Sequence, residues 1–161
     1  MPDYRRNRVP GGTYFFTVNL LERKTGLLVE HQLFHIDAWV VLPDHMHCVW
    51  TLPEGDADYS SRWKAIKIAF SKSMPKTERL SAVRMAKGER GIWQRRYWEH
   101  TIRGEQDYAA HVDYCHINPL KHGMVKQVVD WPYSTFHALV KCGVYSENWA
   151  GATDGELGYE D

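Results

Sequence analysis

The segment from residue 35 to residue 52 constrains the fold more than any other part of the chain. It contains two runs rich in β-branched and aromatic residues, and only Pro43 and Asp44 separate them; the runs read HIDAWVVL (35–42) and HMHCVWTL (45–52). Two strands joined by so short a turn pair as an antiparallel hairpin. The chain is therefore expected to fold around a β-sheet.

Four further segments complete the expected fold. The aromatic and β-branched run 12–20 predicts a first strand, and the less regular run 92–102 predicts a fourth. After a cap at Ser60 or Ser61, apolar residues at steps of three and four predict a helix; they are Trp63, Ile66, Phe70 and Met74. A second helix begins near Gly104 and is expected to end around Asn118, because Pro119 disfavours helical geometry at the residue before it. This order of elements predicts an α+β domain with an antiparallel sheet of four or five strands.

Length and cysteine content limit the class of protein. A chain of 161 residues fits one domain, which we place at 1–146, followed by an acidic and poorly ordered tail at 147–161. The three cysteines are widely spaced and odd in number, which argues against a disulfide framework and favours the cytoplasm. No run of eighteen apolar residues occurs, so we expect no membrane span.

The charges are unevenly distributed although the net charge is zero. Residues 62–97 contain eleven Lys and Arg against two Glu, a net charge of +9, whereas the last fourteen residues contain four acidic side chains and no Lys or Arg. A basic segment of this kind either solvates a helix or binds a polyanion. The second interpretation predicts a nucleic acid partner.

The most specific chemical signal is the pair His45 and His47. Alternate residues of a strand face the same side, so the two imidazoles lie roughly 6.6 Å apart at the backbone and can converge on one cation. Met46, Cys48 and Trp50 then face the other side and serve the core. Spacing alone does not separate a metal site from two structural histidines, and a third ligand is needed.

The helix from Gly104 offers such a ligand. Asp107, His111, Tyr114 and Asn118 fall on one narrow polar stripe, and Tyr108, Val112 and Cys115 on an apolar one. A polar stripe is often only the wet side of a helix. If it faces the sheet instead, the Asn118 oxygen suits a hard cation such as Mg²⁺ or Mn²⁺, and Tyr114 lies one turn before it.

Four motifs in this order, LPDHMH, WQRRYWEHTIR, YCHINPLKHG and DWPYSTFH, resemble the REP-associated tyrosine transposases, a branch of the HUH single-tyrosine nucleases. The resemblance covers most of residues 4–140 and implies a ferredoxin-like antiparallel sheet with flanking helices. It further implies that His45, His47 and Asn118 bind a divalent cation, Mg²⁺ or Mn²⁺, and that Tyr114 is the nucleophile.

The resemblance implies a metal-dependent cleavage and strand transfer of single-stranded or hairpin DNA through a 5′-phosphotyrosine. It also implies DNA contact by Arg5 and Arg6. Other basic residues that we expect to contact DNA are Arg8, Lys64, Lys67, Arg95, Arg96 and Lys121, and two possible auxiliary residues are His100 and His111. The alternative is a catalytically silent DNA-hairpin binding protein on the same fold. Monomer and homodimer both remain open at this point.

The chain departs from the family between the first two strands. The family connects them through a helix, but here only fourteen residues, 21–34, lie between them. A parallel crossover needs about a dozen residues or more. Either the crossover is much reduced or a segment is missing.

Overall fold

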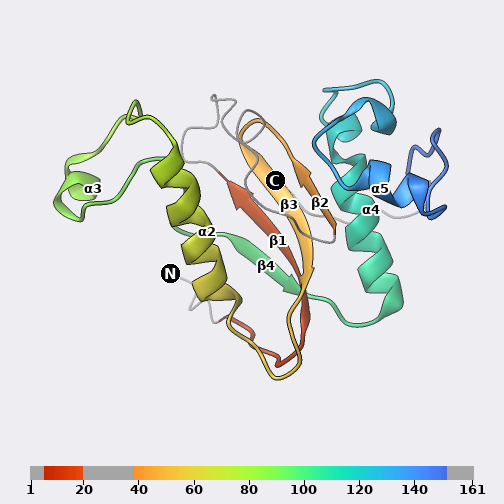
Figure 1. Ribbon diagram of the computed structural model, residues 1–161, viewed down its shortest axis with the longest axis horizontal. Helices are drawn as coiled ribbons and strands as arrows, with labels where there is room; N and C mark the ends of the chain where they lie inside the picture. The colour runs from red at the N-terminus through yellow and green to blue at the C-terminus, as the bar shows by residue number, and fades with distance from the viewer. Residues whose placement is uncertain (1–5, 20–37, 152–161) are drawn as a thin grey trace.

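The fold is built on one four-stranded antiparallel sheet (Figure 1). The computed structural model describes residues 6–19 and 38–151. The strands lie in the order β2-β3-β1-β4, which is the ferredoxin-like order, and their bounds are Thr13–Asn19 for β1, Ala38–Val41 for β2, His45–Thr51 for β3 and Trp98–Thr101 for β4. The expected α+β class and the expected hairpin of β2 and β3 are confirmed.

The alternation of side chains divides the sheet into two faces. On one face the core includes Phe16 from β1 and Met46 and Cys48 from β3, with Trp50 packed against it. On the other face the apolar core includes Phe15 and Val49, and His45 and His47 are buried. Both faces are covered, which explains why the residues of β2 are all buried.

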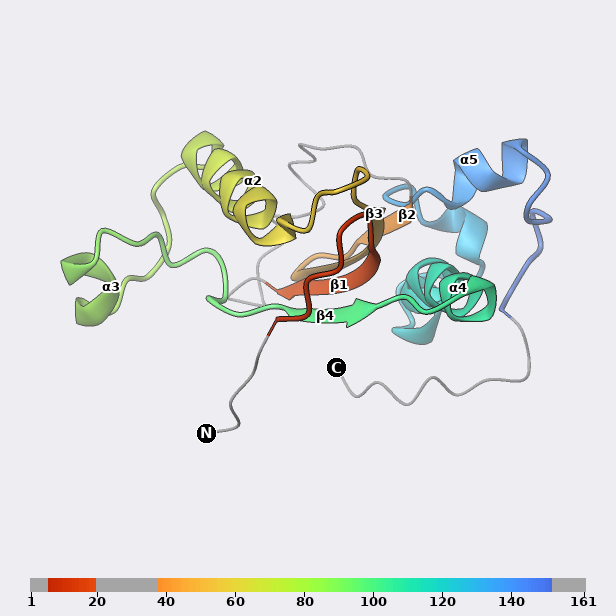
Figure 2. The same cartoon turned by 90° about the horizontal axis from the view of Figure 1, so that it is seen from below.

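Two helices cover these faces from opposite sides (Figures 1 and 2). Helix α2, Tyr59–Ser73, contributes Trp63 and Phe70 to the first core, and helix α4, Glu105–Lys121, contributes Val112 to the second. The cap of α2 is Asp58, whose carboxylate accepts the Ser61 N–H at 3.0 Å, so the prediction of a serine cap was wrong. An Asx side chain at this position satisfies one of the unpaired N–H groups of the first turn.

Helix α4 continues past Pro119, contrary to the expected end around Asn118. The proline ring fixes φ at a value that a helix accepts, but the residue lacks an N–H to donate and its ring crowds the carbonyl four residues earlier. The last turn is closed by the His122 N–H, which donates to the Asn118 carbonyl at 2.9 Å. Pro119 is buried, and the apolar packing of its ring offsets part of the cost of this proline.

The fourth strand is shorter than the run 92–102 from which it was predicted. Ile92 and Trp93 are buried in the core beneath α2, and regular pairing with β1 begins only at Trp98. Between α2 and β4 the chain makes a short helix, α3, at Ala82–Ala86. After α4 it makes a 3-10 helix, η1, at Val128–Asp130 and a short helix, α5, at Phe136–Lys141.

The two ends of the chain are only partly described. Trp149 lies in the predicted tail, yet its ring is 4.6 Å from the Tyr145 ring and 5.8 Å from the Phe136 ring, so this part of the tail packs on the domain. The short connection 21–34 and Arg5 lie outside the described residues. Within residues 6–19 and 38–151, no helix is long and apolar enough to cross a membrane.

Candidate active site

The candidate active site lies between the sheet and α4. His45 and His47 extend from β3 toward this helix, and their ring centres are 5.0 Å apart. The Tyr114 ring lies 5.2 Å from the His47 ring at an interplanar angle of 75°. The polar stripe of α4 therefore faces the sheet, and the interpretation of this stripe as the wet side of the helix was wrong.

The apolar stripe of α4 is only partly buried. Val112 and Cys115 belong to the core, as expected, whereas Tyr108 in the first turn is 42% exposed. By contrast, His111, Tyr114 and Asn118 from the polar stripe are all buried. Polar groups buried in this way need partners, and these partners indicate what the site can bind.

Each histidine of the pair has one ring nitrogen in a hydrogen bond. His45 Nδ1 donates to the Asp44 carboxylate at 2.7 Å, and His47 Nδ1 lies 2.9 Å from the Thr17 hydroxyl, directly across the strand pair. A partner of this kind orients the ring and, when it accepts the Nδ1 proton, leaves the lone pair on Nε2. This is the arrangement that a metal-ligating histidine usually has.

The remaining polar atoms at this point are suited to a cation. Among the described residues, His47 Nε2 and both side-chain polar atoms of Asn118 are buried without a hydrogen-bond partner. One imidazole nitrogen and one amide oxygen, with His45 beside them, form a mixed nitrogen and oxygen donor set of the kind that Mn²⁺ and Mg²⁺ accept. The residues present therefore fit the divalent cation that the sequence predicts.

The electrostatic environment keeps His47 neutral. Burial lowers the pKa of His47 well below its usual value, and His45, His122 and Lys121 lower it further. The Asn118 amide has a small opposite effect on this pKa, although it makes no well-oriented hydrogen bond with the ring. A neutral imidazole is the form that binds a metal.

His122 and Thr17, near the pair, were not assigned a role from the sequence. The His122 ring lies 5.5 Å from the His45 ring, and the Lys121 ammonium, predicted only as a DNA contact, lies 5.1 Å from the centre of the Tyr114 ring. Tyr114, Asn118 and His122 are spaced four residues apart, so the helical period gives a signal for His122. No sequence pattern indicated a role for Thr17, because its position opposite His47 depends on the register of the two strands.

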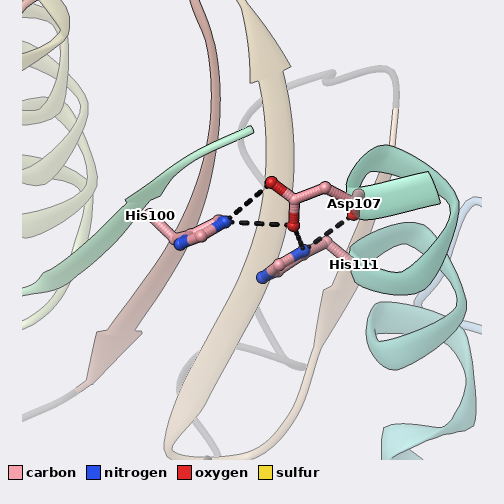
Figure 3. Close-up of side chains that lie close together, drawn as sticks. All are labelled: His100, Asp107 and His111. Carbon is pink, nitrogen blue, oxygen red and sulfur yellow. Dashed lines mark hydrogen bonds and ion pairs between the residues drawn. The ribbon is translucent and has the colours of Figure 1, made fainter. Parts of the chain in front are cut away.

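His100 and His111, the predicted auxiliary residues, are joined by Asp107 (Figure 3). His100 Nε2 lies 3.0 Å and 2.9 Å from the two carboxylate oxygens, and His111 Nδ1 lies 2.8 Å from the Asp107 carbonyl and 3.0 Å from its carboxylate. The three groups lie within 4.8 Å of one another, a spacing that also suits a metal. The Asp107 oxygens also lie opposite both ring nitrogens as in a hydrogen-bonded bridge.

The pKa values agree with a hydrogen-bonded bridge. Burial acts to raise the pKa of Asp107, but hydrogen bonds from His100 and the Arg103 N–H outweigh it and lower this pKa. Burial lowers the pKa of His111. We interpret the cluster as a link between β4 and α4 that supports the helix one turn before Tyr114.

The predicted DNA contacts divide between the two faces of the sheet. Lys121 lies beside Tyr114, whereas Arg6, Lys64, Lys67 and Arg95 line a cavity on the α2 side. Arg8 and Arg96 are exposed. The basic residues thus lie both beside the candidate active site and on the opposite, α2 side of the sheet.

Comparison with known proteins finds related chains. No family model matches the chain. The chain is 50% identical to the REP-associated tyrosine transposase of Escherichia coli K12 over 94% of its own length and 92% of that protein. It is 43% identical to a putative REP-associated tyrosine transposase of Haemophilus influenzae, over 96% of each chain.

A solved structure of a REP-associated tyrosine transposase bound to a REP hairpin has the same fold. The TM-score is 0.79 at 49% sequence identity, and the match covers 100% of this chain and 99% of the other. Similarity at this level over nearly the whole length shows that these proteins belong to one family and share one fold. The chain belongs to the REP-associated tyrosine transposases and is an enzyme of this family.

Proposed function

We propose that this transposase cleaves and rejoins single-stranded DNA next to a REP-type hairpin through a covalent bond to Tyr114. The observation that carries the proposal is the position of the Tyr114 ring against His47, beside the buried and unsatisfied Asn118 amide. The solved relative at 49% identity is bound to a REP hairpin, which supports the same class of substrate here.

The proposed reaction is a displacement at phosphorus. The Tyr114 hydroxyl loses its proton and its oxygen bonds to the phosphorus, while the bond from phosphorus to the 3′ oxygen breaks and this oxygen takes up a proton. The products are a 5′-phosphotyrosine and a free 3′ hydroxyl, so the bond energy is kept for rejoining.

We assign the cation to His45, His47 and Asn118. These three residues would hold a divalent cation, whose positive charge would polarise a non-bridging phosphate oxygen. Thr17 and Asp44 orient the two imidazoles, and Lys121 adds a positive charge next to the tyrosine ring. These residues position the phosphate against the weakly nucleophilic phenol.

A single chain is proposed to form the complete site. Tyr114 of α4 and His47 of β3 come together within one chain, so a monomer suffices and the tyrosine acts in cis. We also propose that the enzyme acts in the cytoplasm, which accords with the three free cysteines Cys48, Cys115 and Cys142.

The central test is formation of a covalent adduct. Labelled hairpin DNA with single-stranded flanks is incubated with protein and Mn²⁺, and the adduct is measured after denaturation. Tyr114→Phe is expected to abolish the adduct while DNA binding persists. Tyr108→Phe is the matched control, because Tyr108 lies on the same helix and is exposed.

A mixing experiment tests action in cis. His47→Ala and Tyr114→Phe are each expected to be inactive, and a mixture of the two is expected to remain inactive. Recovery of the adduct in the mixture would show that one chain supplies the tyrosine to another.

Binding of hairpin DNA by the wild type without any covalent adduct would favour the alternative, a catalytically silent binding protein.

A further inference from the structure

A second candidate site lies on the other side of the sheet from Tyr114. It is a cavity of about 730 Å³ between α2 and the segment 74–97, which includes α3, and its lining includes Arg6 and Tyr97. Figures 1 and 2 show this segment beyond α2, away from α4. The volume falls within the range of pockets that bury small organic groups.

The floor of the cavity is apolar. Trp63, Met74 and Trp93 line it and are buried at 1%, 6% and 7% exposure, whereas Ile68 lines it and is 44% exposed. An isolated apolar side chain on the surface needs no explanation, but one that continues into a concave apolar floor indicates a ligand-binding surface.

The rim of the cavity is strongly basic. Several of its cations are already neutralised: Arg90 pairs with Glu78, Arg95 with Glu89 at 3.0 Å, and Arg84 with Glu89 at 3.7 Å. Lys64, Lys72 and Lys76 line the same cavity and have no ion-pair partner within the described ranges. Their charges remain available to an anionic ligand.

Lys67 connects the rim with the floor. Its ammonium donates to the Gln94 carbonyl at 3.1 Å and lies 5.1 Å and 5.6 Å from the ring centres of Tyr97 and Trp93. On the same wall, the Arg6 guanidinium lies 4.0 Å from the centre of the Tyr97 ring. An apolar floor with cations around its edge matches a nucleotide, which has a flat apolar base and a charged phosphate.

We propose that this cavity binds one unpaired nucleobase of the DNA substrate, with the adjoining phosphates on Lys64, Lys72 and Lys76. The base must be unpaired, because a paired base is stacked within the helix and cannot enter a concave pocket. The inference rests on the proposed function for the identity of the substrate. It adds a recognition site that the sheet separates from the scissile phosphate.

The experiment uses a hairpin DNA with unpaired flanking nucleotides, in which an abasic site replaces each unpaired base in turn. For the wild type, loss of one particular base is expected to weaken binding about tenfold, since stacking of a single base has effects of this order. The same position labelled with 2-aminopurine is expected to change its emission on binding, which gives a second measurement without mutation.

Two matched variants locate the effect in the cavity. Ile68→Glu places a negative charge in the lining, and Ala69→Glu places the same charge one residue further along α2, outside the lining. Both positions are exposed, so both variants are expected to fold. Ile68→Glu is expected to lose the tenfold dependence on that base, and Ala69→Glu to keep it.

The outcomes separate this inference from the proposed function. The Tyr114 adduct is measured separately in the wild type, where it reports on the proposed reaction and not on the cavity. The proposed base pocket would be wrong if the wild type bound all the abasic DNAs with equal affinity. It would also be wrong if Ile68→Glu kept the dependence of affinity on that one base. Both conclusions hold whether or not the adduct forms. Absence of the adduct in the wild type would contradict the proposed reaction. The affinities for the abasic DNAs would still test the cavity independently.

Discussion

Thr17 illustrates how one hydroxyl on a neighbouring strand can control the chemistry of a histidine. Its oxygen lies 2.9 Å from His47 Nδ1, and its strand position is directly opposite His47. The hydroxyl accepts the Nδ1 proton in the tautomer that leaves a lone pair on Nε2. Partners of this kind typically contribute 10–100-fold to metal affinity.

We therefore expect Thr17→Val to raise, by about 10-fold or more, the Mn²⁺ concentration that gives half-maximal adduct. Valine keeps the shape of threonine and removes the hydroxyl. Thr13→Val is the control, because Thr13 lies on the same strand and its hydroxyl pairs with that of Thr51 at the exposed end. An equal Mn²⁺ requirement in both variants would show that Thr17 does not act on His47.

At the scale of elements, α2 contains a half-buried cation, Lys67, that makes stability depend on pH. Burial is the largest cause that lowers the pKa of Lys67, to about 8, and Arg6 lowers it further. In the unfolded chain this pKa is about 10.4. Between these values the unfolded state binds more protons, so stability increases as the pH rises.

We expect the wild type to gain about 1–2 kcal/mol in the free energy of unfolding, relative to Lys67→Met, between pH 7.5 and pH 9.5. Methionine keeps the length of the side chain and has no charge to bury. Urea unfolding of both proteins at the two pH values measures the difference, and the comparison cancels the other groups that titrate. The same difference at both pH values would contradict the lowered pKa.

The elements differ in how far they follow from the sequence. Strands β1 and β3 agree with their local enrichment in aromatic and β-branched residues, and α2 agrees with its helical period, because that period reflects one buried face of the helix. Strand β4 is shorter than expected, because Ile92 and Trp93 pack beneath α2 and make only isolated pairing, whereas the regular ladder with β1 begins at Trp98. The short helices α3 and α5 had no pattern long enough to detect.

For the candidate site too, local patterns predicted some features, whereas features that depend on long-range contacts could not be predicted. The common side of His45 and His47 depends only on strand alternation, and the common stripe of Tyr114 and Asn118 depends only on the helical period. The contact of these two sets depends on which face of the sheet α4 covers, and the sequence alone left this open. The Asp107 bridge between His100 and His111 likewise joins β4 to α4 through contacts that local periodicity does not specify.

At the scale of the whole molecule, positive charge surrounds the α2 side although the chain as a whole is neutral. If Lys72 and Lys76 contact phosphates, their removal reduces the number of counterions released on binding. We expect the double variant Lys72→Gln, Lys76→Gln to lower the slope of log affinity against log salt by roughly 1–2, since each phosphate contact on single-stranded DNA contributes about 0.7.

The matched control for this measurement is Lys126→Gln, Lys141→Gln. It removes the same charge from two exposed positions beyond α4, and neither lines the cavity. An unchanged slope in the first variant, or an equal change in both, would show that the α2 side makes no specific contribution. Binding titrations at several salt concentrations distinguish these results.

The placement of α2 and α4 on opposite faces of one sheet has a consequence for evolution and for engineering. Residues on the α2 side can be exchanged without altering any side chain that touches Tyr114, because the strands lie between them. Related transposases can in this way acquire new DNA target sites while their active site stays unchanged. An engineer can test the same principle by grafting residues 74–97 from one relative onto another.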